Sequence, residues 1–147
     1  MNVLIWLKRD LRLYDHPALT LAAGLGAVLP VYVAEPDLWQ QPDASARQWG
    51  FVAESLAALR EDMQGHGLTL AVRMGDAVEV LSRLCLRHGI STIISHEETG
   101  NGWSFARDRR VAAWARGVLE AALLHAERAD RVSSLPPRPE RLVYHTR

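Results

Sequence analysis

The order of apolar and polar positions predicts alternating strands and helices along most of the chain. Short apolar runs that end at glycine, proline or charge are typical of strands buried in a parallel sheet, and apolar steps of three and four residues are typical of helices packed on it. The apolar runs predict strands at 2–7, 27–33, 68–74 and 90–95. Capping residues predict helices that begin near His16, Ser45, Asp76 and Trp103. This order predicts an α/β fold: a doubly wound, Rossmann-like parallel sheet with helices on both faces and the first strand at its centre.

Two segments qualify this pattern. Pro30 lies inside the second predicted strand, and because proline has no backbone N–H, we expect that strand to lie at an edge or to be bulged there. The helix after Ser45 carries a single apolar stripe, which predicts a face buried in the core. The stripe consists of Trp49, Val52, Leu56, Leu59 and Met63.

The composition fits one domain with an apolar core, because 48% of the 147 residues are hydrophobic. The formal net charge is zero, so we expect no nucleic-acid binding by this chain alone. The single Cys85 lies in an apolar helical run and is predicted to be a buried small hydrophobe. No disulfide framework, membrane-spanning run or signal peptide is evident, which predicts a cytoplasmic protein without a membrane partner.

Charged residues follow the first predicted strand directly. Lys8, Arg9, Asp10 and Arg12 stand where the carboxyl edge of the sheet is expected, and that edge is where open α/β sheets bind ligands and neighbouring domains. One interpretation is that these charges order the sheet edge and a domain boundary. The alternative is a solvated charged turn.

The motifs that carry common chemistry are absent. No glycine-rich phosphate loop follows the first strand, and the six histidines show no metal spacing, so we predict neither a metal site nor a catalytic residue. The polar loops at 34–44 and 96–102 are expected at the same sheet edge as the charged turn. With Trp39 and Trp103 they form possible walls for a flat aromatic ligand, although each tryptophan alone is more often a packing residue.

Five motifs in order resemble the N-terminal α/β domain of the DNA photolyase/cryptochrome family. The last of them is similar to the branch of cyclobutane-dimer photolyases called class III. They are W-L-K-R-D-L-R-L-Y-D-H-P-A-L at 6–19, V-L-P-V-Y-V at 28–33, S-A-R-Q-W-G-F-V-A-E-S-L at 45–56, V-R-M-G-D at 72–76 and H-E-E-T-G-N-G-W-S-F-A-R-D-R-R-V-A-A-W at 96–114.

The resemblance implies a light-harvesting antenna domain. In this family a second pigment absorbs blue or near-ultraviolet light and passes excitation to FAD, and excited, reduced FAD donates an electron that splits a pyrimidine dimer. The implied antenna of this branch is methenyltetrahydrofolate. A carboxylate accepts hydrogen bonds from a pterin edge and an indole stacks on its face. The candidate pterin-binding residues are Trp39, Glu97, Glu98, Asn101 and Trp103.

The chain departs from the family after residue 117. The family continues with a fifth strand, a linker and a helical domain that holds FAD and damaged DNA, and we expect all of these to be missing here. We therefore expect an antenna domain at 1–117, truncated after the fourth strand–helix unit, and a divergent tail at 118–147. Within the tail, residues 118–125 are predicted to continue the helix and the proline-rich residues 133–147 to be irregular.

The predicted function is the light-harvesting half of a photolyase-like protein that does not repair DNA alone. Three alternatives stay open. A cryptochrome-type blue-light signalling protein differs from a photolyase in the missing domain, so this chain does not separate the two. An unrelated nucleotide-binding α/β module is disfavoured by the lack of a phosphate loop. The last alternative is a non-functional fragment.

Overall fold

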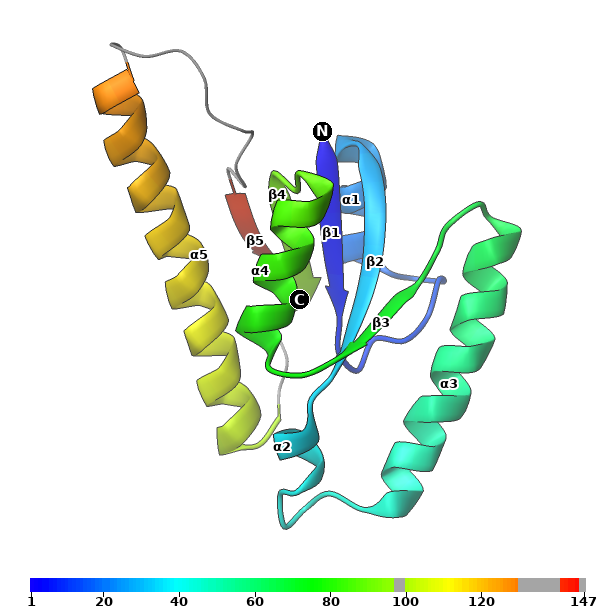
Figure 1. Ribbon diagram of the computed structural model, residues 1–147. Helices are drawn as coiled ribbons and strands as arrows, with labels where there is room; N and C mark the ends of the chain where they lie inside the picture. The colour runs from blue at the N-terminus through cyan, green and yellow to red at the C-terminus, as the bar shows by residue number, and fades with distance from the viewer. Residues whose placement is uncertain (97–99, 130–140, 146–147) are drawn as a thin grey trace.

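The computed structural model describes residues 1–96, 100–129 and 141–145, with side chains through Gly117 (Figure 1). Strands and helices alternate along most of it. The elements are β1 (Asn2–Leu7), α1 (Pro17–Leu25), β2 (Ala27–Ala34), α2 (Pro36–Trp39), α3 (Ala46–Gly65), β3 (Ala71–Met74), α4 (Ala77–His88), β4 (Thr92–His96), α5 (Gly102–Ala129) and β5 (Arg141–His145).

The strands form one parallel sheet in the order β3-β2-β1-β4-β5, with β1 at its centre. Helices α4 and α5 pack on one face and α1 and α3 on the other. Figure 1 shows α4 and α5 on the near side of β1. The predicted doubly wound α/β fold is confirmed. The third strand is shorter than predicted, because pairing with β2 begins only at Ala71.

Strand β1 contributes to two separate apolar cores. Leu4 and Trp6 belong to the core under α4 and α5, whereas Val3, Ile5 and Leu7 belong to the core under α1 and α3. All five side chains are at most 1% exposed. A strand buried on both faces has an uninterrupted apolar run, which is why this segment carries no alternating pattern.

The predicted caps begin their helices as expected. Ser45 and Gln48 form a capping box at α3, and the carboxylate of Asp76 accepts the amide N–H groups of Val78 and Glu79 at α4. Side-chain acceptors at these positions satisfy amide donors that have no partner within the helix. At the other end of α4, Gly89 has φ +57°, a left-handed conformation that glycine adopts without strain.

Pro30 lies where β2 has a strand neighbour on one side only. The β1–β2 register runs without a bulge from Asn2↔Ala27 to Leu7↔Tyr32, whereas β3 pairs only with residues 31–34. Strand β2 is therefore an interior strand at residues 31–34, but at Pro30 its side away from β1 has no strand neighbour. Because no strand there needs a backbone N–H from Pro30, the proline is tolerated. Neither prediction, an edge strand or a bulge, describes the whole of β2.

The tail is more regular than expected. Helix α5 continues through residues 118–125 to Ala129, as predicted. The prediction that 133–147 is irregular is wrong for Arg141–His145, which pairs in parallel with β4. The expectation that the sheet lacks a fifth strand is therefore wrong as well. Local composition missed this strand because the exposed edge of β4, not intrinsic propensity, supplies its partner. Residues 130–140 and 146–147 lie outside the described residues.

Among the helices of the described residues, none combines the length and hydropathy needed to cross a bilayer. The division of the chain into a domain at 1–117 and a tail at 118–147 stays a prediction.

Candidate functional site

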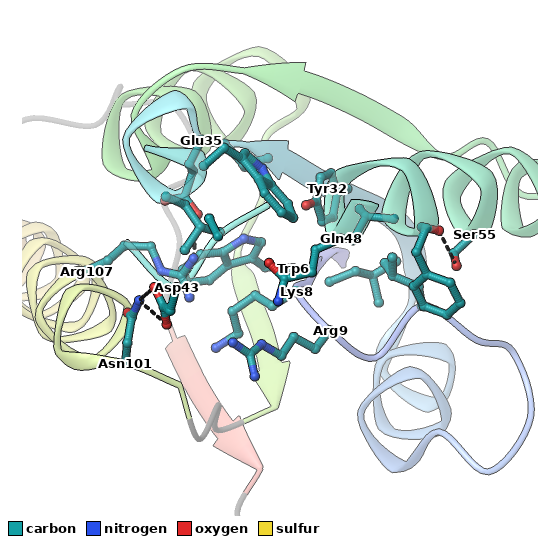
Figure 2. Close-up of a pocket in the computed structure, with 18 of the residues that line it drawn as sticks. Trp6, Lys8, Arg9, Tyr32, Glu35, Asp43, Gln48, Ser55, Asn101 and Arg107 are labelled. Atoms are coloured by element: carbon teal, nitrogen blue, oxygen red, sulfur yellow. Dashed lines mark hydrogen bonds and ion pairs between the residues drawn. The ribbon is translucent and has the colours of Figure 1, made fainter. Parts of the chain in front are cut away.

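The carboxyl ends of β1 and β2 open into a cavity of about 730 Å³ (Figure 2). Its walls come from the loop at 8–12, from the segment that contains α2, from the N-terminal half of α3 and from the start of α5. Loops that follow neighbouring parallel strands converge at this edge, which makes it the usual ligand site of open α/β sheets. The volume lies within the range of roughly 300–1,000 Å³ usual for small-molecule sites.

A network of buried charges forms one wall of the cavity. Arg107 donates a hydrogen bond to the carboxylate of Glu35, which directly follows β2, and a second to Asp108 at 3.0 Å. Lys8 donates to the other oxygen of Asp108 at 3.1 Å. The Lys8 ammonium and the Arg107 guanidinium lie 4.7 and 5.0 Å from the ring centre of Trp6. These contacts fasten the end of β1 and the end of β2 to α5.

This network decides between the two interpretations of the charged turn. Lys8 and Asp10 are each only 7% exposed, so a solvated turn is wrong for them and they order the sheet edge. Arg9 and Arg12 are exposed and line the cavity. Arg12 donates to the backbone carbonyls of Tyr14 and Asp15 at 3.0–3.3 Å.

The rim of the cavity carries an excess of positive charge. Arg9 and Arg12 come from the loop at 8–12, and the exposed Arg47 comes from the first turn of α3. The acidic lining residues Glu35 and Asp43 already accept hydrogen bonds from Arg107 and Asn101. An anionic group on a ligand is therefore favoured at this rim.

Trp39 of α2 lines the cavity and packs against Trp49 of α3, which is not one of the lining residues. The Trp39 and Trp49 rings meet edge to face with centres 5.1 Å apart. The Trp39 indole N–H is buried and has no hydrogen-bond partner among the described residues. A buried donor without an acceptor is costly, so a ligand acceptor at this atom is favoured. The predicted apolar stripe of α3 is buried at Leu56, Leu59 and Met63, but Trp49 is 37% exposed because the helix extends past the core beside the cavity.

The structure brings together only some of the predicted pterin-binding residues. Trp39 and Asn101 line the cavity. The Asn101 amide donates to both Asp43 oxygens at 2.9 and 3.0 Å, and its carbonyl oxygen accepts the Ser104 amide N–H at 2.9 Å. Asn101 thus caps α5 and joins it to the segment before α3.

Trp103 does not line the cavity; its ring centre lies 5.6 Å from the Arg107 guanidinium. Glu97 and Glu98 lie outside the described residues.

Sequence reasoning missed several cavity residues, notably Trp6, Glu35, Arg47, Gln48 and Arg107. Trp6 and Glu35 had a usable signal, because each stands at or just after the carboxyl end of a strand. Arg47 and Gln48 also follow a recognisable cap, but nothing local shows that the start of α3 faces this edge. The position of Arg107 depends on how α5 crosses the sheet.

A second buried cluster lies behind the charged turn. One carboxylate oxygen of Asp10 lies 2.8 Å from His16 Nε2 and 2.8 Å from His96 Nδ1, and the other accepts the Lys8 amide N–H at 2.9 Å. The two imidazole rings stack with centres 4.6 Å apart. Burial opposes ionisation of Asp10, but hydrogen bonds from His16 and from the Lys8 amide outweigh it and hold the pKa of this carboxyl well below its ordinary value.

This cluster has the residue types of a metal site, and its ligand atoms all lie within 4.8 Å of one another. The surrounding donors argue against that role. His16 Nδ1 accepts the Leu19 amide N–H at 3.1 Å, and His96 Nε2 accepts the Ala18 amide N–H at 3.4 Å. An imidazole that binds a metal through one nitrogen normally carries a proton on the other nitrogen. In this cluster the other nitrogens accept backbone N–H groups, so metal binding would place two N–H donors against each other.

Comparison with known proteins gives consistent matches. A family model described as DNA photolyase matches residues 3–130. The chain is 34% identical over 103 residues to "Cryptochrome DASH, chloroplastic/mitochondrial" of Arabidopsis thaliana, covering 65% of this chain and 18% of that protein. It is 36% identical over 93 residues to a "Deoxyribodipyrimidine photo-lyase" of Agrobacterium fabrum, covering 63% of this chain and 19% of that protein. The chain therefore spans about a fifth of the length of these curated relatives.

Solved structures agree with this similarity. A bacterial class III photolyase from Agrobacterium tumefaciens superposes with a TM-score of 0.69 at 25% identity, covering 97% of this chain and 25% of that one. A Synechocystis cryptochrome superposes with a TM-score of 0.69 at 28% identity, covering 78% of this chain and 25% of that one.

Proposed function

Because the chain belongs to the DNA photolyase family, we propose that it acts as a light-harvesting domain that holds a flat antenna pigment in the cavity at the carboxyl edge of its sheet. The match is to the N-terminal region of photolyases and cryptochromes. The observation that carries the proposal is the buried Trp39 indole N–H, a donor without an acceptor in the wall of a cavity large enough for a fused heteroaromatic ring.

The residues fit methenyltetrahydrofolate, the pigment that the sequence motifs imply. A pterin offers a flat ring to aromatic walls and a carbonyl acceptor to Trp39, and its glutamate carboxylates match the arginine rim formed by Arg9, Arg12 and Arg47. When bound, the pigment would supply absorption of blue or near-ultraviolet light for transfer to FAD. Glu97, Glu98, Asn101 and Trp103, the other residues that the sequence analysis suggested, stay proposed contacts of the pigment.

We further propose that repair of damaged DNA, and binding of FAD, belong to the full-length proteins of the family rather than to this chain. A net charge of zero leaves it without the basic field that holds DNA. The proposed antenna domain is 1–117, with 118–147 as a divergent tail. The lack of a disulfide framework supports a location in the cytoplasm, whereas the cryptochrome DASH relatives of three plants carry chloroplastic/mitochondrial names.

A second candidate is a fragment of a cryptochrome-type signalling protein, favoured by the similarity to cryptochromes in both sequence and structure. The two candidates share the antenna cavity and differ in what the excited FAD does. Light-dependent dimer repair by a protein that continues this chain into an FAD domain would support the photolyase, and stable photoreduction without repair would support the cryptochrome.

Titration of the purified chain with methenyltetrahydrofolate tests the proposal, followed by the absorption and fluorescence of the pigment. We expect saturable binding. Trp39→Phe keeps an aromatic ring, although a smaller one, and removes the donor, so affinity should fall at least about tenfold, the worth of one buried hydrogen bond. Arg47→Gln should weaken binding by a similar factor, whereas the matched control Arg60→Gln, exposed further along α3, should leave it unchanged.

Variants of the loop test the remaining proposed contacts. If the pigment extends from the cavity to Trp103, Glu98→Ala should weaken binding and Trp103→Ala should weaken it further, because stacking area is lost. If both leave the affinity unchanged while Trp39→Phe lowers it, the pigment lies in the cavity alone. No spectral change at high pigment concentration with the wild-type chain would refute the proposal.

A further inference from the structure

Two buried histidines have defined protonation states because backbone amides face them. Backbone N–H groups only donate, so His16 Nδ1 accepts from Leu19 and His96 Nε2 accepts from Ala18. The remaining nitrogens, His16 Nε2 and His96 Nδ1, face the Asp10 carboxylate and carry the protons. In this arrangement each ring uses one nitrogen as a donor to Asp10 and the other as an acceptor from α1. We call Asp10, His16 and His96 the Asp10 relay.

The Asp10 relay connects three elements that are distant in sequence. Asp10 follows β1, His16 caps α1 and His96 ends β4. The amide N–H groups that it binds belong to the first turn of α1, where donors have no partner within the helix. All three side chains are buried, at 7%, 3% and 8% residue exposure, so water does not replace a lost bond.

Protonation of either imidazole converts an acceptor of this relay into a donor. The new N–H then faces an amide N–H of α1 at the positive end of the helix dipole, and the hydrogen bond is lost. Among the described residues, the charged group in contact with both rings is Asp10, whose carboxylate also accepts the backbone amide N–H of Lys8. Helix α1 has no charged side chain.

The relay also supports the wall of the cavity. Lys8, Arg9, Leu11 and Arg12 line the cavity, and Asp10 in their midst is the residue that anchors their loop through its buried carboxylate. We propose that the Asp10 relay is a pH-sensitive support for the antenna cavity: with both imidazoles neutral it holds α1 and the loop at 8–12 in place, and protonation releases them and lowers the affinity for the pigment. Only the last step of this inference, the lower affinity for the pigment, rests on the proposed function.

Amide hydrogen exchange of the pigment-free chain tests the structural step. Between roughly pH 8 and 5, where histidines change charge, the protection factors of Ala18 and Leu19 should fall about tenfold, the effect expected for loss of a helix N-cap. His16→Asn supplies a side-chain oxygen that caps a helix without titrating, so its Leu19 protection factor should stay constant. The matched control His88→Asn, at an exposed position, should keep the wild-type pH dependence.

Pigment binding at the same pH values tests the second step. Affinity of the wild-type chain should fall about tenfold with the Leu19 protection factor, and that of His16→Asn should fall less. Constant wild-type protection, or an equal fall in His16→Asn, would overturn the inference whether or not the pigment binds. Pigment affinity that is independent of pH while protection falls would overturn the link to the cavity. If no pigment binds at any pH, the proposed function fails, and the exchange experiment still decides the structural step.

Discussion

Arg107 and Glu35, 72 positions apart in sequence, form an ion pair with side chains only 2% and 5% exposed. The pair links the carboxyl end of β2 to α5 across the wall of the cavity. Two charges removed from water are tolerated only when hydrogen bonds replace their hydration. Asp108 provides one of these bonds to Arg107.

Removing one member of this pair should be costly. Glu35→Gln leaves a buried guanidinium without its main counter-charge, and we expect the free energy of unfolding to fall by about 3 kcal/mol. The double variant Glu35→Met with Arg107→Met should be less destabilised than either single Met variant. Urea unfolding measures the free energy of unfolding of the wild-type chain and of each single and double variant. Glu79→Gln, in an exposed pair with Arg83, is the control and should change stability by at most about 0.5 kcal/mol. Equal small effects for Glu35 and Glu79 would contradict the prediction.

Acid should destabilise the chain through Asp10. The folded pKa of this carboxyl lies below its ordinary value, so its contribution to stability is fully present above the unfolded pKa of about 3.9 and is lost as the pH falls toward the folded pKa. Asp10→Asn should therefore be less stable than wild type at neutral pH by about 2 kcal/mol, and the difference should shrink below about pH 4. Thermal unfolding at several pH values measures it. The exposed Asp37→Asn should follow the wild-type curve.

Cys85 should be unreactive in the folded chain. Burial raises the pKa of this thiol to about 12, and the thiolate is the reactive form. An aromatic disulfide reagent at about pH 8 should modify it only after denaturant is added. Leu86→Cys places a thiol at the neighbouring position, which is 83% exposed, and that thiol should react at once. Rapid modification of the wild-type chain without denaturant would contradict the buried position.

Strand β5 should protect the outer edge of β4. A chain that ends at Ala129 lacks β5, so the amides of β4 that pair with it should exchange faster while those of β2 stay protected. Hydrogen exchange resolved by residue compares the two chains. Identical protection along β4 in both would show that β5 contributes nothing to the sheet.

Local sequence patterns were sufficient where a residue's role depends on its own element. The apolar run of β1 and the lower stripe of α3, at Leu56 and Met63, are buried as predicted, because strand and helix periodicity alone decide which side chains face a sheet. The prediction that Trp49 is buried is wrong, because the N-terminal part of α3 extends beyond the apolar core. The strand at Arg141–His145 was missed because its partner edge lies 49 residues earlier, at Thr92–His96.

Site residues were predictable only in part, because a cavity depends on which elements the fold brings together. Trp39 was found from its place near a strand end. Glu35 stood in a segment expected to be a polar loop, and nothing local indicated that Arg107 would bury it. His96 was predicted to begin a polar loop at the sheet edge and was rejected as a metal ligand on spacing, yet its neighbours are Asp10 and His16 across the sheet.

Successive side chains of strand β1 enter different cores. The strand therefore tolerates a change in its length by an even number of residues better than a change by an odd number, because only the even change keeps each side chain on its own face of the sheet. Deletion of one residue of β1 before Trp6 would turn the Trp6 ring toward α1 and away from Arg107 of α5, because side chains alternate with a period of two. Insertion of two residues would keep every side chain on its own face, but it would carry the loop at 8–12 about 7 Å beyond the cavity. Neither change alters composition or hydropathy appreciably. The number of residues in β1 therefore determines where the loop at 8–12 lies relative to the cavity.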